Sequence, residues 1–302
     1  MGFRVTTRML IDQSLANLRT QQQQLALLQE RLSTGKQINR PSDDPVGTRR
    51  AMATRTSITN IDQFLSNVRE AQSFSRISED AVQGVIDNVR RVRELTLQGA
   101  NGTLAQEQRD GLALQINQLL EAVIDLANTQ SGRRFVFAGT RTQTKPFDPT
   151  IVGGEVTAVT YQGNSDTFDV AVSEGLTLTV NQTGDSVFQD LQDTFQTLID
   201  IRSDLRISDI DSLSNVRLGE LDDIETQLLN SLGVYGANSN RLSLVEERLR
   251  DDGLNFRDLL SVTEDADFAE TIMEYNAQEV AFQAALQAGM RLIEPSLLDF
   301  LR

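Results

Sequence analysis

The feature that most constrains the fold is one long apolar pattern, between residues 45 and 98, that no proline interrupts. Apolar residues recur there at steps of three and four, from Ile58 to Leu95, as on one face of a helix. At about 1.5 Å per residue, such a helix is roughly 80 Å long. This length is typical of a bundle or coiled coil and argues against a compact globule. Asp44 and Pro45 are the expected N-cap and first helical residue.

Further helices are expected on both sides of the middle of the chain. A turn at residues 99–102 precedes a helix over residues 104–129, for which Thr103 is the expected N-cap. This helix and the long one before it should form an antiparallel hairpin. Later in the chain, Asp185 is expected to cap a helix, and another helix, broken near residues 231–236, follows it.

Both ends of the chain carry a narrow apolar stripe of the heptad type. The first lies on a helix over residues 5–34, which Gly35 should end, and the second lies on a helix over residues 268–293. Pro295 should end that second helix and leave residues 296–302 as an amphipathic end. Neither helix can bury its stripe alone, so we expect them to pair and to serve assembly within a chain, between chains, or both. The residues of this assembly stripe are Ile11, Leu15, Leu18, Leu25, Leu32, Phe268, Ile272, Tyr275, Phe282, Leu286 and Ile293.

Between about residues 133 and 183 the pattern changes to an alternation of apolar and polar residues, which predicts short strands. A module of about 50 residues is too small for a large core of its own, so we expect it to lean on the helices. The expected strands are 134–139, 156–161, 167–172 and 176–180, with turns at Gly153-Gly154, Gly163-Asn164 and Glu174-Gly175.

The patterns together predict a mainly α protein with a small β-rich insertion. We expect an elongated helical rod whose terminal helices pair as an antiparallel coiled coil. The expected domains are a terminal coiled-coil domain (1–42 and 266–302), a helical rod domain (43–132 and 185–265) and a β-rich outer domain (133–184).

The composition removes most kinds of enzyme chemistry. The chain has no cysteine and no histidine, which excludes thiolate nucleophiles, imidazole bases and cysteine-ligated metal sites. Neighbouring carboxylates on a helix point about 100° apart, so the pairs at residues 43–44, 222–223 and 251–252 fit solvated faces or caps better than an acid–base site. We therefore expect no enzyme, with no catalytic residue, cofactor or metal, although a carboxylate enzyme is the rival from another class.

Charge and hydropathy also limit the partners. A formal net charge of −15 disfavours nucleic acid, which requires a basic face. No run approaches the about 18 consecutive apolar residues of a membrane span, so we expect no membrane insertion. The first ten residues lack the apolar run of a conventional signal peptide.

Three segments near the two ends of the chain resemble the flagellin superfamily. They are residues 38–47 (INRPSDDPVG), 232–242 (LGVYGANSNRL) and 264–270 (EDADFAE), in the order and at the distance expected for that family. Other features resemble the subunits that join hook and filament more than flagellin itself. These are residues 41–45 (PSDDP), residues 134–139 (RFVFAG) followed by Pro146-Phe147, and the end at residues 296–301 (SLLDFL).

The resemblance implies a structural subunit of the bacterial flagellum that acts as an adaptor at the hook–filament junction. It implies export through the flagellar type III channel, unfolded and without a cleaved signal, to an extracellular position. The implied partners are like subunits in a ring, the hook-side junction protein, flagellin or the filament cap, and an export chaperone at the C-terminal region. It also implies that the terminal helices line the inner tube and that the β-rich insertion faces outward.

Two other structural functions stay open. A divergent flagellin that forms the filament itself is the nearer alternative, and its abundance in sheared flagella would separate it from a trace junction component. An adhesin or coiled-coil scaffold without flagellar context is the second alternative, but it would not need paired motifs at both ends of the chain.

Overall fold

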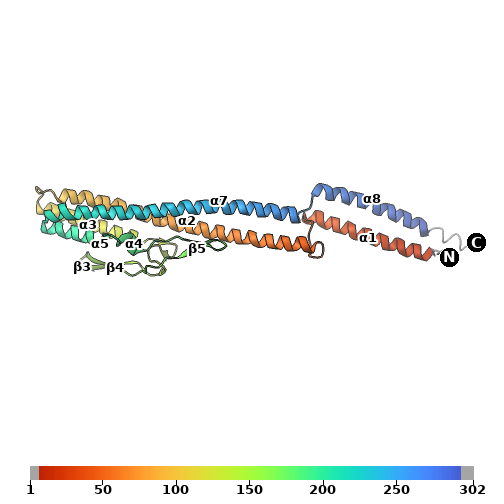
Figure 1. Ribbon diagram of the computed structural model, residues 1–302, viewed down its shortest axis with the longest axis horizontal. Helices are drawn as coiled ribbons and strands as arrows, with labels where there is room; N and C mark the ends of the chain where they lie inside the picture. Colours follow the sequence, from red (N-terminus) through yellow and green to blue (C-terminus); the bar gives the residue numbers. More distant parts are fainter. Residues whose placement is uncertain (1–6, 294–302) are drawn as a thin grey trace, which may run out of the picture. The chain divides into compact units, whose positions relative to one another are not determined.

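The computed structural model describes residues 7–293, with side chains from residue 9 to residue 290 (Figure 1). Helices make up most of this range and the strands are short, which confirms the mainly α class with a small β-rich insertion. The expected amphipathic end at residues 296–302 lies outside the described residues, as does the side chain of Ile293. Among the helices of residues 7–293, none is both long and apolar enough to cross a membrane.

The chain divides into two compact units. We call Met1–Asn60 together with Asp252–Arg302 the terminal unit, and Ile61–Asp251 the central unit. Two long helices, α2 (Pro45–Gly99) and α7 (Leu218–Glu264), contribute residues to both units. The three-domain division expected from the sequence stays a prediction.

Helix α2 begins and continues as expected. The Val46 N–H donates to Asp44 Oδ1 at 3.0 Å, so Asp44 is the N-cap, and the helix runs without a break to Gly99. It forms an antiparallel hairpin with α3 (Gln106–Ala127), because Arg109 Nε donates to the Gly99 carbonyl at 3.2 Å while Gly84 lies against Leu126 near the other end of α3. The predicted antiparallel hairpin is therefore confirmed.

The expected N-cap of α3 is wrong. Asn101 Oδ1 accepts both the N–H and the hydroxyl of Thr103, at 3.1 and 2.9 Å, and so keeps Thr103 in the turn. The helix begins after Ala105, whose N–H donates to Gln108 Oε1 at 3.1 Å. A local side-chain turn has competed here with helix capping.

Helix α7 has no break near residues 231–236, contrary to expectation. Tyr235 is 0% exposed in the middle of this segment and belongs to the hydrophobic core of the central unit. Each glycine, Gly233 and Gly236, costs a helix about 1 kcal/mol, which the burial of an aromatic side chain offsets. Burial also raises the pKa of Tyr235.

Helices α2 and α7 pair antiparallel within the central unit. Gln72 Nε2 donates to Glu246 Oε2 at 3.0 Å near one end of the pair, and Arg90 Nε donates to Glu225 Oε1 at 2.8 Å near the other. The bond from Gln72 is the largest contribution that lowers the pKa of Glu246, with Arg250 and Arg69 adding to it. The interface between α2 and α7 thus has polar contacts at its edges and buried apolar side chains in its interior.

The helix expected to start at Asp185 is two helices, α4 (Gly184–Phe188) and α5 (Thr194–Ile207). Thr183 precedes the first, so Asp185 is not its N-cap. The chain leaves the helix after α4 because Gln227 of α7 accepts the N–H of Leu191 through its side-chain oxygen, at 2.8 Å. A three-residue helix, α6 (Ile210–Ser212), and a π-helical turn, η1 (Leu213–Arg217), connect α5 to α7.

The strands form three separate antiparallel pairs. The expected strand at residues 134–139 is shortened to its first two residues, because the Phe137 carbonyl accepts bonds from the Gly184 N–H and the Tyr161 hydroxyl instead. Strand β3 was not expected and contains a proline, Pro149. The pairs are β1 (Gln130–Ser131) with β2 (Arg134–Phe135), β3 (Phe147–Val152) with β4 (Glu155–Tyr161), and β5 (Asp169–Ser173) with β6 (Leu176–Thr179).

The β3–β4 pair packs into the helical core of the central unit. Phe147 is 0% exposed, and its ring centroid lies 5.4 Å from that of Phe188 and 4.8 Å from that of Phe195. Arg202 of α5 is buried and donates to the Val156 carbonyl of β4 at 2.7 Å. The strands and the helices therefore share one core, as the small size of the β-rich segment suggested.

Candidate assembly surface

The terminal unit is built on two helices from opposite ends of the chain, α1 (Thr7–Thr34) and α8 (Phe268–Ile293). They lie side by side in Figure 1 and run antiparallel, since Gln278 Nε2 donates to Gln24 Oε1 at 2.9 Å while Gly289 lies against Ser14 and Leu18. The predicted antiparallel pairing of the terminal helices is confirmed.

The last residue of α1 and the first residue of α8 lie beside the same short turn, which begins at Gly35. Gly35 follows α1 with a φ of +70°, the left-handed conformation that makes glycine the usual residue after a helix. A Cβ added at Gly35 would lie 3.5 Å from the Phe268 ring, so the first residue of α8 packs over this glycine. Asp267 caps α8, because its Oδ1 accepts the N–H of Ala269 at 2.8 Å.

One buried carboxylate ties these connections together. Glu264, at the end of α7, has a side chain only 6% exposed and pairs with Lys36 at 2.5 Å and with Arg55 of α2. Its backbone carbonyl accepts the Gln37 N–H at 2.7 Å. The turn between α1 and α2 is thereby fixed to the turn between α7 and α8, both within the terminal unit.

Pairing covers the assembly stripe only in part. Leu15 stays 50% exposed, Ile272 48%, Leu286 40% and Phe268 53%. The stripe is therefore not fully buried by α1 and α8 alone, and its role in contacts between chains stays a prediction. The half-buried members are Ile11, Leu18, Leu25, Leu32, Tyr275 and Phe282.

Part of the stripe lines an apolar pocket of about 200 Å³ between the two helices. It brings together predicted residues from both ends of the chain. The lining residues are Ile11, Ser14, Leu15, Leu18, Leu286, Gly289 and Met290. A Cβ added at Gly289 would make an ordinary contact with Ser14 Oγ at 3.5 Å, so the pocket has room for a methyl group at this position.

A second apolar face of α8 was missed by the sequence analysis. Met273 is 66% exposed and Val280 67% exposed, and they alternate with exposed alanines at steps of four and three. The signal was present in the sequence, but small alanines separate the two large residues, and the first stripe already accounted for the helix. We call this set the outer face of α8: Ala269, Met273, Ala277, Val280 and Ala284.

Contiguous exposed apolar area is a feature of interaction surfaces, and a role for this face in contacts between chains stays a prediction. On α1, Met9 and Leu10 add to it with 56% and 44% exposure. Within the described residues, helices α1 and α8 of the terminal unit therefore carry apolar side chains that stay exposed.

Comparisons with known proteins agree with this geometry. The family described as the bacterial flagellin N-terminal helical region matches residues 5–142. Flagellar hook-associated protein 3 of Escherichia coli strain K12 is 26% identical over 310 residues, which cover 94% of this chain and 95% of that protein. The chain is homologous to flagellar hook-associated protein 3.

Two further flagellar proteins are similar to this chain, one in structure and one in sequence. A solved structure of the flagellar junction protein FlgL from Legionella pneumophila superposes with a TM-score of 0.59 at 19% identity, covering 73% of this chain and all of that one (100%). The flagellar filament 30.7 kDa core protein of Treponema maltophilum is 26% identical over 257 residues, covering 85% of this chain and 84% of that protein. The resemblance to the flagellin superfamily read from the motifs is confirmed, and the proteins that this chain resembles are structural components of flagella.

Proposed function

We propose that this chain is a structural subunit of the bacterial flagellum that acts as an adaptor at the hook–filament junction, joining the hook-side junction protein to the flagellin filament. The observation that carries the proposal is the similarity to flagellar hook-associated protein 3 over nearly the full length of both chains. The motifs at residues 134–139 and 41–45 point to the same subgroup.

The terminal unit supplies the contacts for assembly. The outer face of α8 and the exposed part of the assembly stripe can bury apolar area against a second copy of this chain, at roughly 25 cal/mol for each Å² removed from water. A ring of like subunits would bury this surface on every copy, since one face of each subunit meets another face of the next. The ring would then contact the hook-side junction protein on one side and flagellin or the filament cap on the other.

Export is part of the proposal. We infer that the chain leaves the cell through the flagellar type III channel in an unfolded state and acts outside the cell. Before export, Met273 and Val280 would expose an apolar face that favours aggregation. A chaperone bound at the C-terminal region, over α8, would cover that face until the subunit reaches its position.

A second candidate function is that of a divergent flagellin. The Treponema maltophilum filament core protein favours it, since it is as similar in identity as the hook-associated relative, although over less of the chain. The two functions differ in copy number and place: a flagellin forms the whole filament, whereas an adaptor occupies one short segment. The more complete match supports the adaptor.

A deletion strain tests the proposed function. Without this chain, we expect complete hooks, no attached filaments and flagellin monomers shed into the medium, because export continues while the filament has no base. Electron microscopy of the cells and immunoblotting of the medium measure both results, and the gene supplied on a plasmid should restore filaments. Normal filaments in the deletion strain would exclude an essential adaptor, and loss of flagellin itself from the medium would favour the flagellin alternative.

A further inference from the structure

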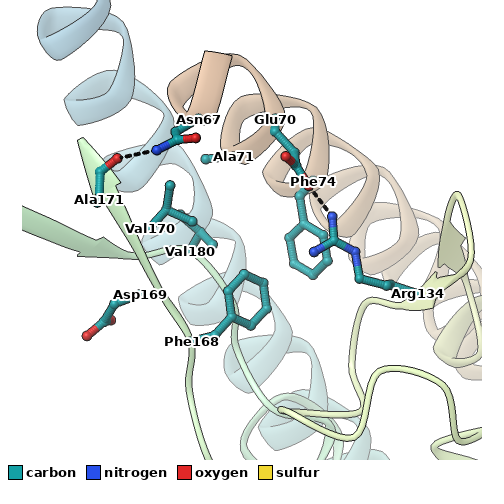
Figure 2. Close-up of a pocket in the computed structure, with 10 residues that line it drawn as sticks. All are labelled: Asn67, Glu70, Ala71, Phe74, Arg134, Phe168, Asp169, Val170, Ala171 and Val180. Atoms are coloured by element: carbon teal, nitrogen blue, oxygen red, sulfur yellow. Dashed lines mark hydrogen bonds and ion pairs between the residues drawn. The ribbon is translucent and has the colours of Figure 1, made fainter. Parts of the chain in front are cut away.

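The central unit contains a pocket of about 320 Å³ between helix α2 and strand β5, which we call the α2–β5 pocket. Figure 2 shows Phe74 of α2 and Phe168 lying together at its base, with Val170 and Val180 beside them. The two rings meet edge to face, with centroids 5.2 Å apart and planes at 80°. Ala71 completes the apolar floor from the helix side.

Two polar contacts lie at the rim of this pocket. On one side, Glu70 of α2 pairs with Arg134 of β2, as Figure 2 shows, and the two side chains are 65% and 47% exposed. On another side, Asn67 Nδ2 donates to the Ala171 carbonyl at 2.9 Å. Helix α2 therefore contacts both the β1–β2 pair and the β5–β6 pair, and the apolar floor of the pocket lies between these two contacts. An apolar floor inside a polar rim is the arrangement in which interfaces hold an anchoring side chain.

The chain segment that supplies the strand side of the pocket carries only acidic charges. Between residues 146 and 185 the chain has no lysine and no arginine, and every charged residue there is a carboxylate. Asp169 belongs to the pocket itself, and Arg134 is the basic group at the rim, already paired with Glu70. The acidic residues of this segment are Asp148, Glu155, Asp166, Asp169, Glu174 and Asp185, of which Glu155 is paired with Arg206. Asp169 in the pocket, with the exposed Asp166 and Glu174 at the two ends of the same strand, attracts a basic partner and repels an acidic one.

We propose that the α2–β5 pocket binds one aromatic side chain of a partner protein, carried on a segment with basic residues on either side of it. The pocket is large enough for a single ring, and the edges of Phe74 and Phe168 offer the edge-to-face contacts that aromatic pairs favour. The basic neighbours of that ring would lie over the acidic surface of the β-rich segment. This surface belongs to the central unit, so the proposal does not depend on the terminal unit or on the function proposed above.

A short peptide probe tests the proposal on the full-length protein. Acetyl-Arg-Trp-Arg-amide, titrated into ¹⁵N-labelled protein, should shift the Asn67 side-chain amide and the backbone amides of residues 168–171, with saturation at a Kd of about 1 mM. Acetyl-Arg-Ala-Arg-amide lacks the ring and acetyl-Glu-Trp-Glu-amide reverses the charge, so each should bind at least about tenfold more weakly. Equal affinity for the Trp and Ala peptides would overturn the proposal, because it would mean attraction by charge alone.

Two variants separate the pocket from the surface charge. Ala71→Leu places a larger side chain in the floor and should abolish binding of the Arg-Trp-Arg probe, whereas Ala53→Leu, on an exposed position of the same helix, should leave it unchanged. Glu174→Lys changes an exposed turn without touching the floor and should weaken binding about threefold or more through the field alone. Full binding to a folded Ala71→Leu protein would overturn the proposal, and so would an Arg-Trp-Arg affinity that Glu174→Lys leaves unchanged.

Discussion

Val280→Asp in the outer face of α8 should abolish assembly at the hook–filament junction while leaving the isolated subunit folded. Val280 is 67% exposed, and aspartate is no worse than valine in a helix by more than a few tenths of a kcal/mol, so the free subunit loses little. In an assembled ring the carboxylate would be buried without a partner, at a cost of several kcal/mol. We expect cells without attached filaments and a purified protein whose far-UV circular dichroism and thermal unfolding match the wild type.

Gln283→Glu is the matched control for this substitution. Gln283 is exposed and lies about 60° round α8 from Val280, next to Glu279, so the variant adds the same charge beside the outer face and not within it. It should assemble normally. If Val280→Asp cells carry intact filaments, the outer face is not an assembly surface.

Phe147→Ala should produce the largest loss of stability in the central unit, about 3–5 kcal/mol. Phe147 begins β3, yet it contacts the rings of Phe188 and Phe195 on the helical side as well as Tyr161 of β4. The cavity would therefore open inside the core that strands and helices share. Urea unfolding followed by far-UV circular dichroism measures this loss on the helices themselves.

Ile151→Ala provides the comparison on the same strand. Ile151 is 62% exposed, so this variant should change the free energy of unfolding by no more than about 0.5 kcal/mol. An unchanged helical transition in Phe147→Ala would mean that the β-rich segment unfolds independently. That result would support the separate outer domain at residues 133–184 and contradict the shared core.

The helical framework could be predicted because its signals are local and repeated. The period of α2, the cap at Asp44 and the left-handed glycine at Gly35 each depend on neighbours in sequence, and the structure contains all three. The pairing of α1 with α8 followed from a different argument, that a narrow stripe needs a partner.

The predictions that were wrong depended on distant residues. Gly233 and Gly236 indicated a break, but Tyr235 between them is held by the core of the central unit. The sequence around Asp185 predicts one continuous helix. The helix ends instead where the N–H groups of Leu191 and Gln192 donate to Gln227 of α7. No local pattern contains such information, because the partner is supplied by the fold.

The candidate site was predicted in part for a related reason. Heptad spacing identified the assembly stripe but not the outer face, since periodicity shows which residues share a face and not which face stays uncovered. Whether α1 covers Phe282 or Val280 depends on the rotation of α8 in the pair. Only the structure contains that rotation, with Phe282 half-buried and Val280 exposed.

The position of the protein in intact flagella tests the proposed junction function most directly. A short epitope can be inserted between Gly153 and Gly154, where the turn has open space around both residues. Immunogold electron microscopy of purified hook–filament complexes should then place label at a single band where hook and filament meet. Label along the whole filament would contradict the adaptor function and identify the chain as a filament subunit.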